Sequence, residues 1–351
     1  MTEESLNYSH VSLAMTTTGM TQITGGNTVT SSSPRGIEFY FQIAVLVIAV
    51  AGTAANALVL YALVASKQHK KNALIVHQNA LDLFASFSTI VSYTTRLCNI
   101  RLTGSAGYWL CTVILSDCLS WWGSGASAIN LASITLERYL KVVYPAWSQN
   151  KLRSRMMNTA TAAACIVSFI NNVAVVFPTS DVINGVCYAY SFWKNQAVYM
   201  LNSIWNFLFY YAVILFIFVI CYWRILFAIR RQARVMSGHA AAGSNAAQNH
   251  YDQIQSNVIK TMIFVCACYA ISWSPAYIHQ FIVVLYPEQM LYGSIYYGCS
   301  LLAYSYMCTN PFIYAVKLNP VRKVLLRLIP CYETSEEAAE SAGRPVELGQ
   351  R

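Results

Sequence analysis

Long apolar stretches separated by short polar connections dominate the chain. Each of seven stretches is long enough to cross the hydrocarbon core of a bilayer as a helix, which takes ~20 residues. They cover residues 38–65, 73–97, 108–142, 156–178, 196–229, 256–285 and 292–316. The stretches are too long and too uniformly apolar for the alternating strands of a membrane barrel. The pattern therefore predicts an all-α membrane protein, a seven-transmembrane helix bundle.

The segments outside these spans divide the chain further. Residues 1–37 are rich in Ser and Thr and precede the predicted transmembrane domain, residues 38–318. They contain no apolar core of a cleavable signal peptide, so we expect the first span to direct its own insertion. Residues 319–331 carry a basic and an apolar face, which predicts a short amphipathic helix on the membrane surface. An acidic, polar tail follows at residues 332–351.

The positions of the basic residues predict an orientation. Of 23 Lys and Arg, nineteen fall on one side of the predicted membrane and only Arg35, Arg96, Arg101 and Lys194 on the other. Basic residues concentrate in cytoplasmic connections. We therefore expect an extracellular N-terminus, a cytoplasmic C-terminus and a location in the plasma membrane. This placement between apolar spans accounts for the net charge of +9 without a nucleic-acid partner.

The composition excludes several other classes of protein. Hydrophobic residues make up 56% of the chain and charged residues 11%, against ~25% charged residues in a typical soluble domain. A disordered protein is excluded by the same hydrophobic excess. Most of the 11 cysteines lie inside apolar stretches, and no spacing typical of a metal site occurs. No nucleophile, base and acid set is apparent either, so we expect no enzyme.

Polar and aromatic landmarks follow one another along the spans in a distinctive order. They are Asn56, Asp82, Glu137-Arg138-Tyr139, Tyr222, Trp273 with Pro275, and Asn310-Pro311-Phe312-Ile313-Tyr314. This order resembles that of rhodopsin-like (class A) G-protein-coupled receptors over roughly residues 38–331. The resemblance implies a receptor that binds an extracellular ligand in the bundle and activates a heterotrimeric G protein by opening its cytoplasmic side.

The resemblance also implies an activation switch. In such receptors Glu137 would hold Arg138 in the resting state, and Arg138 would face the G protein in the active one. Pro275 removes a backbone hydrogen bond and bends its helix beside Trp273, although a core tryptophan next to a structural kink explains the same residues. At the distal partner position stands Gln255, which predicts a weak resting lock. The implied switch residues are Glu137, Arg138, Tyr139, Tyr222, Trp273, Pro275, Asn310, Pro311 and Tyr314.

A buried carboxylate in the second span is a candidate sodium site. Asp82 cannot remain ionised alone in hydrocarbon, and the resemblance implies that Ser127 and Asn310 help it to bind Na⁺. Other positions that are often polar in the family hold Gly123, Tyr306 and Met307. A hydrated carboxylate without sodium is the alternative. We expect no other metal and no cofactor.

Helical spacing places a set of polar and aromatic residues on one inward face near the outer side of the bundle. This candidate ligand pocket comprises Asp117, Ser120, Trp121, Ser124, Trp273, Tyr277, Gln280, Tyr297, Ser300 and Tyr304. Tyr304 stands where opsins carry a Schiff-base lysine, so retinal is not expected. Ser120 stands where amine receptors carry an aspartate. Asp117, nearer the mouth, suits a basic or amidated peptide, and we predict a peptide ligand.

Covalent features follow from the expected topology. The resemblance implies a disulfide between Cys111 and Cys187, with Cys98 and Cys118 as competing partners. Cys111 lies 27 residues before Arg138, two more than is common in the family. Asn7 begins a glycosylation sequon, and Cys331 is placed for palmitoylation.

Departures from the family pattern keep alternatives open. The fourth span lacks the usual Trp, and Ile214 replaces the usual Pro of the fifth. A non-signalling scavenger or scaffold with receptor architecture is the first alternative. A small-molecule transporter is a weaker one, because no internal repeat is visible. Besides the G protein, the resemblance implies arrestin, a receptor kinase and membrane lipid as partners.

Overall fold

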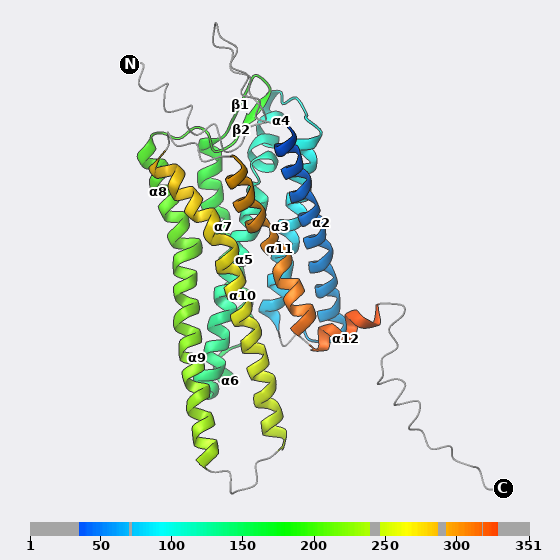
Figure 1. Ribbon diagram of the computed structural model, residues 1–351, viewed down its shortest axis with the longest axis vertical. Coiled ribbons are helices and arrows are strands. Elements are labelled where there is room, and N and C mark those ends of the chain that lie inside the picture. Colours follow the sequence, from blue (N-terminus) through cyan, green and yellow to red (C-terminus); the bar gives the residue numbers. More distant parts are fainter. Residues whose placement is uncertain (1–34, 70–71, 239–245, 287–292, 318, 329–351) are drawn as a thin grey trace, which may run out of the picture.

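The computed structural model describes residues 35–69, 72–238, 246–286, 293–317 and 319–328. Its elongated bundle is built from long helices that run side by side (Figure 1). Most helices lie within a few residues of the predicted spans, but α9 continues nine residues past the predicted fifth span and α10 begins ten residues before the predicted sixth. In order, with their accessory elements, they are α2 (Arg35–Ala65), α3 (Ala73–Leu97), α4 (Gly104–Trp109), η2 (Leu110–Leu115), α5 (Cys118–Val143), α6 (Pro145–Lys151), α7 (Ser154–Thr179), α8 (Gln196–Phe207), η3 (Leu208–Ala212), α9 (Val213–Gly238), α10 (Ala246–Leu285), α11 (Gly293–Lys317) and α12 (Asn319–Arg327).

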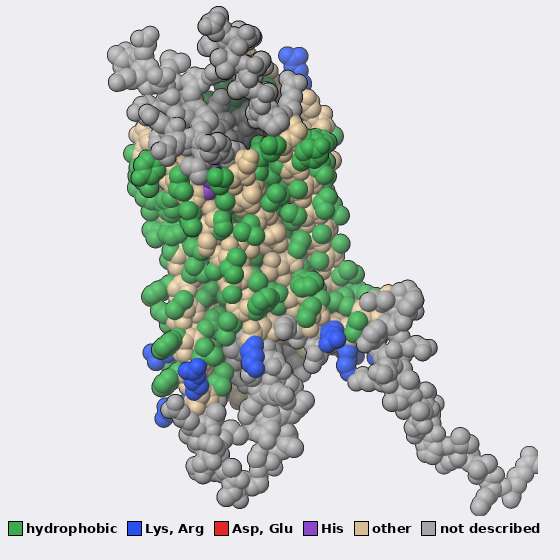
Figure 2. Space-filling view, in the orientation of Figure 1, with side chains coloured by type: hydrophobic (Ala, Val, Ile, Leu, Met, Phe, Trp, Pro, Cys, Tyr) green, Lys and Arg blue, Asp and Glu red, His purple; other side chains and the backbone are tan. Residues whose placement is uncertain are grey.

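The outer surface of the bundle is apolar. Trp223, Val219 and Phe216 are among its most exposed side chains, at 73%, 67% and 66%. A surface of this kind needs an apolar surrounding rather than water. By length and composition, four described stretches could each cross a membrane: Gly36–Ala65, Ala73–Leu97, Ser154–Thr179 and Gln196–Arg231. Figure 2 shows hydrophobic side chains along the flank of the bundle and most of the visible Lys and Arg at its lower end, on the α9 side as well as near α12.

A small β-hairpin closes one end of the bundle, called the hairpin end below. Strands β1 (Asp181–Ile183) and β2 (Val186–Tyr188) pair antiparallel. They are joined by Asn184 and Gly185, whose φ values of 54° and 82° are those of a tight hairpin turn. The opposite end carries the amphipathic helix α12, which runs nearly perpendicular to the bundle (Figure 1).

The predicted third span is not one continuous helix. It consists of α4, the wide π-helical turn η2 and α5, and Asp117 separates η2 from α5 in the left-handed conformation, with φ of 58°. A π-helical turn takes up extra residues over the same length of helix axis. Together with the break at Asp117, it accommodates the two additional residues between Cys111 and Arg138.

A second π-helical turn interrupts the fifth span. η3 lies between α8 and α9, two residues before Ile214, which stands where the family usually has proline. The long interior is then filled by side chains of α2, α3, α5, α9, α10 and α11. Tyr314, Ile134 and Ile225 are fully buried at its centre, and Val321 of α12 packs against the same core.

Candidate functional site

The end of α5 opposite the hairpin holds the predicted switch. The Arg138 Nε lies 3.8 Å from the Glu137 carboxylate, and an Arg138 N–H donates to Asn72 Oδ1 at 3.3 Å. Glu137 has a closer partner in Lys141, one turn along α5, whose Nζ lies 2.6 Å from Oε1. Glu137 is therefore shared between two cations. The sequence indicated neither Lys141, although its i,i+4 spacing is favourable, nor Asn72.

The tyrosines of the predicted switch lie near this end of the bundle, but the described hydrogen bonds do not join them to one another. Tyr222 lies with its hydroxyl 3.4 Å from Thr135 Oγ1 and 3.7 Å from the Cys266 thiol. Tyr314 is fully buried, and its hydroxyl has no hydrogen-bond partner among the described residues. Tyr139 packs edge-on against Tyr144. The side chain of Gln255 lies outside the described residues, so the weak distal lock stays a prediction.

Halfway along the bundle, Asp82 is the centre of a buried polar cluster. Ser127 Oγ donates to its Oδ1 at 2.5 Å, and Asn310 Nδ2 donates to its Oδ2 at 2.7 Å. The structure thus brings the three predicted residues together. It adds Gln78, whose amide donates to Asp82 Oδ2 and to Ser127, and Asn130, which donates to Gln78 Oε1 at 2.9 Å.

The cluster borders a cavity of about 20 Å³, lined also by the hydroxyl-bearing side chains Ser124 and Tyr306. Such a cavity has room for about one water-sized particle. The carboxylate and hydroxyl oxygens are suitable ligands for a small cation. The amides of Gln78 and Asn310, however, already donate hydrogen bonds to Asp82 Oδ2 and use part of its capacity to bind a cation. The residues fit a sodium ion in part, and its binding stays a prediction.

Towards the hairpin end the helices enclose a wide cavity, the outer cavity, of about 820 Å³. Six of the predicted pocket residues line it, namely Asp117, Trp121, Gln280, Tyr297, Ser300 and Tyr304. The disulfide between Cys111 and Cys187 is present, and it joins β2 to η2 beside this cavity. Cys98 and Cys118, the competing partners, are free thiols.

Asp117 does not present a free carboxylate to the outer cavity. Arg96 Nη2 lies 2.6 Å from its Oδ2, Ser92 donates to its Oδ1, and the Tyr304 hydroxyl donates to Oδ2 at 3.4 Å. The guanidinium also donates to the Leu115 carbonyl at 2.6 Å. The sequence analysis assigned Arg96 only to an outer connection. The geometry therefore favours an internal ion pair between α3 and α5 over an anchor for a cationic ligand.

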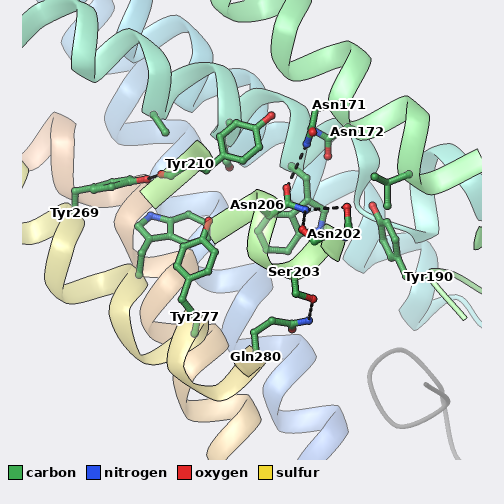
Figure 3. Close-up of a pocket in the computed structure, with 17 residues that line it drawn as sticks. Asn171, Asn172, Tyr190, Asn202, Ser203, Asn206, Tyr210, Tyr269, Tyr277 and Gln280 are labelled. Carbon is green, nitrogen blue, oxygen red and sulfur yellow. Dashed lines mark hydrogen bonds between the residues drawn. The ribbon is translucent and has the colours of Figure 1, made fainter. Parts of the chain in front are cut away.

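Deeper between α5, α7, α8 and α10 lies a second cavity, the inner cavity, of about 320 Å³ (Figure 3). Ser124, Trp273 and Tyr277 line it, while Trp121 and Gln280 line both cavities. The predicted Ser120 lines neither of them, because it faces α3 and accepts a hydrogen bond from Thr89 at 3.0 Å. Its helical spacing from Asp117 was misleading, since the helix breaks between α4 and α5.

The sequence analysis missed the polar wall of the inner cavity. Asn171 and Asn172 from α7 and Asn202 and Asn206 from α8 line it (Figure 3). These residues lie in predominantly apolar spans. Only the number of asparagines in two consecutive transmembrane segments could have indicated them.

The chain's family is decided by comparison of its sequence with family profiles. The profile described as 7 transmembrane receptor (rhodopsin family) matches residues 55–314. The chain belongs to this family.

Curated relatives and a solved structure agree with that assignment. Human galanin receptor type 3 is 26% identical over 63% of this chain and 59% of its own length, and mouse somatostatin receptor type 3 is 22% identical over 86% and 72%. Zebrafish sphingosine 1-phosphate receptor 1 is 24% identical over 79% and 74%. The crystal structure of squid rhodopsin superposes with a TM-score of 0.70 at 16% identity, covering 90% of this chain and 93% of that one. This rhodopsin-family receptor is thus a multi-pass membrane protein and not an enzyme.

Proposed function

We propose that the chain is a plasma-membrane receptor that activates a heterotrimeric G protein when an extracellular ligand enters the outer cavity. The hairpin end and N-terminus face the outside in this proposal, and α12 lies on the cytoplasmic leaflet. The distribution of basic residues supports that orientation. The side chains of Asn7 and Cys331 lie outside the described residues, so glycosylation and palmitoylation are proposals too.

The observation that carries the proposal is a continuous chain of contacts from the inner cavity to the Asp82 cluster. Trp121 and Trp273 pack with ring centroids 6.1 Å apart, and Trp273 packs on Tyr269 at 6.3 Å. Tyr269 contacts Tyr306 at 5.3 Å, and the Tyr306 hydroxyl donates to Asn310 at 3.4 Å. Pro275 lies two residues beyond Trp273 and removes the hydrogen bond to the Ile271 carbonyl, which makes α10 easier to bend there.

Ligand binding and G-protein contact can be coupled only through a change between two states of the bundle. Asp117 and Arg138 are about twenty residues apart, or ~30 Å along a helix. A ligand shifts such an equilibrium by binding one state better than the other. In our proposal it displaces Trp273, bends α10 at Pro275 and frees Arg138 for the G protein.

We propose a peptide as the ligand class. Galanin and somatostatin, for which two of the relatives are named, are peptides. The outer cavity of about 820 Å³ is large enough for several side chains. We further propose arrestin and a receptor kinase as partners of the active state.

Guanine-nucleotide exchange on purified G proteins tests the proposal. A peptide library is applied to the wild type and to Arg138→Ala at matched surface expression. We expect at least one peptide to stimulate exchange by the wild type, and Arg138→Ala to bind it without stimulating exchange. If the wild type binds a peptide but does not stimulate nucleotide exchange on any of the G proteins, a scavenger or scaffold is favoured instead.

A further inference from the structure

The lining of the inner cavity carries no charge. Its seventeen described residues include neither an acid nor a base. Aromatic rings, among them Trp121, Trp273 and Tyr277, form one side of it. Four asparagines, Asn171, Asn172, Asn202 and Asn206, form much of the other, and Gln280 adds a fifth carboxamide from α10, the helix of Trp273 and Tyr277 (Figure 3). An ionised group that entered this cavity would lose its hydration and find no opposite charge, which is costly.

Three of these carboxamides satisfy only part of their hydrogen-bonding capacity within the chain. Asn206 donates to Asn202 Oδ1 at 3.1 Å, and Asn202 Nδ2 has no acceptor among the described residues. Asn172 Nδ2 donates to the Ser168 carbonyl at 2.8 Å, and Gln280 Nε2 donates to Tyr199 at 2.8 Å. No described donor reaches Asn172 Oδ1 or Gln280 Oε1. The cavity therefore offers unused donors and unused acceptors together.

The indole of Trp273 adds a further donor. Its Nε1 is buried and has no partner within the described residues. Buried polar atoms in proteins are normally paired with protein or water. Trp273 lines both the inner cavity and the small cavity beside Asp82, so a ligand can satisfy this buried donor only after the indole moves.

The remaining carboxamide contacts explain how the wall is held in place. Trp205 Nε1 donates to Asn171 Oδ1 at 2.7 Å, and Asn171 Nδ2 donates to Asn206 Oδ1 at 3.2 Å. Asn206 in turn also donates to the Asn202 carbonyl at 2.9 Å. This relay joins α7 to α8 and fixes the rotamers of Asn171 and Asn206. A clasp between helices accounts for these two side chains but leaves the free atoms of Asn172, Asn202 and Gln280 unexplained.

We infer that the inner cavity selects an uncharged, amide-bearing group of the ligand, with its amide against Asn172, Asn202 and Gln280 and its apolar body against the aromatic side. An amide both donates and accepts, which matches the mixture of free atoms. The inference rests on the proposed receptor function and specifies the chemistry of its ligand. Asp117 takes no direct part in it, because Arg96 neutralises that carboxylate in the outer cavity.

Three matched probes test the inference on the full-length receptor in lipid nanodiscs. At pH 6 N-acetylphenylalaninamide is uncharged, phenylalaninamide is largely a cation because an α-amino group has a pKa of about 7.7–8.0, and N-acetylphenylalanine is an anion. Dissociation constants are measured by saturation-transfer NMR. We expect the uncharged probe to bind about tenfold more tightly than either charged probe, or more. Tenfold is about the change in affinity that one good hydrogen bond contributes, and the desolvation of an unpaired ion costs at least as much.

Variants locate the binding. Asn202→Leu keeps the branched shape and the number of heavy atoms of the side chain, and Asn206 retains the backbone carbonyl of residue 202 as an acceptor. We expect it to weaken the uncharged probe about tenfold. Asn150→Leu, an exposed change in α6, is the matched control and should behave as the wild type. If Asn202→Leu does not reach the nanodisc, Gln280→Met removes a carboxamide from α10 and decides the same question.

Two results would overturn the inference. One is tighter binding of the cation that is lost in Asp117→Asn; the other is an uncharged-probe affinity that neither carboxamide variant changes. Either result leaves the exchange assay with the peptide library free to support the receptor proposal. Conversely, if the uncharged probe binds preferentially but no peptide stimulates nucleotide exchange, the inference about the inner cavity is supported and the proposed signalling function is contradicted.

Discussion

Neutralising Asp117 should destabilise the receptor rather than alter ligand charge preference. Its carboxylate is 7% exposed and the Arg96 side chain 22% exposed, so the pair is largely removed from water. Removing one partner of a buried pair typically costs about 3–5 kcal/mol, because the other charge is left uncompensated. Partial exposure of Arg96 to the outer cavity reduces that cost, and we expect about 2–3 kcal/mol for Asp117→Asn.

The conformation of Asp117 makes asparagine the informative substitution. The residue has φ of 58°, a left-handed conformation that Asn tolerates nearly as well as Asp. Asp117→Asn therefore removes the charge without adding backbone strain. Asp117→Leu would add about 1–2 kcal/mol of strain to the same loss of charge and should be the less stable of the two.

A double-mutant cycle with Arg96 separates the ion pair from other effects. Thermal unfolding of the purified receptor is followed by tryptophan fluorescence, together with surface expression. Asp117→Asn and Arg96→Gln should each lower the unfolding temperature, and the double variant should be more stable than their summed effects predict. Strictly additive effects would refute a coupled pair, and an unaltered unfolding temperature in Asp117→Asn would refute the electrostatic argument itself.

Three further outcomes follow from the described contacts. Cys111→Ala should reduce surface receptor strongly, since removing a native disulfide costs about 2–5 kcal/mol in small secreted domains; wild-type surface staining would contradict this. Lys141→Met should lower basal nucleotide exchange and Glu137→Gln should raise it, because Lys141 competes with Arg138 for the Glu137 carboxylate. A change of basal exchange in the same direction in both variants would contradict this. NaCl, compared with choline chloride, should raise the unfolding temperature of the wild type but not of Asp82→Asn if sodium binds there.

The helices could be predicted closely because the membrane imposes a simple rule. Every backbone group in hydrocarbon must be paired within its own segment, so long apolar stretches become helices, although α9 and α10 continue nine and ten residues into the polar sequence beyond their predicted spans. The family resemblance also placed motif residues, and the structure brings Asp82, Ser127 and Asn310 together as that resemblance implied. Gln78 completes that cluster and is one turn before Asp82, but a polar residue near the end of a span gives no sign of which way it points.

The third span shows where local pattern stops being sufficient. The pattern of apolar residues does not indicate a π-helical turn or a single left-handed residue. Ser120 was therefore predicted to line the ligand pocket but faces α3, whereas Trp121 does line both cavities. The pairing of Asp117 depends on Arg96, which ends a different helix and counted only as a basic residue outside the membrane. The Asp117 carboxylate, which alone suggested a cationic ligand, is neutralised when the fold brings Arg96 within 2.6 Å of it. Selectivity in the proposed pocket then has to come from the uncharged carboxamides of α7 and α8, residues that no charge-based interpretation of the sequence would select.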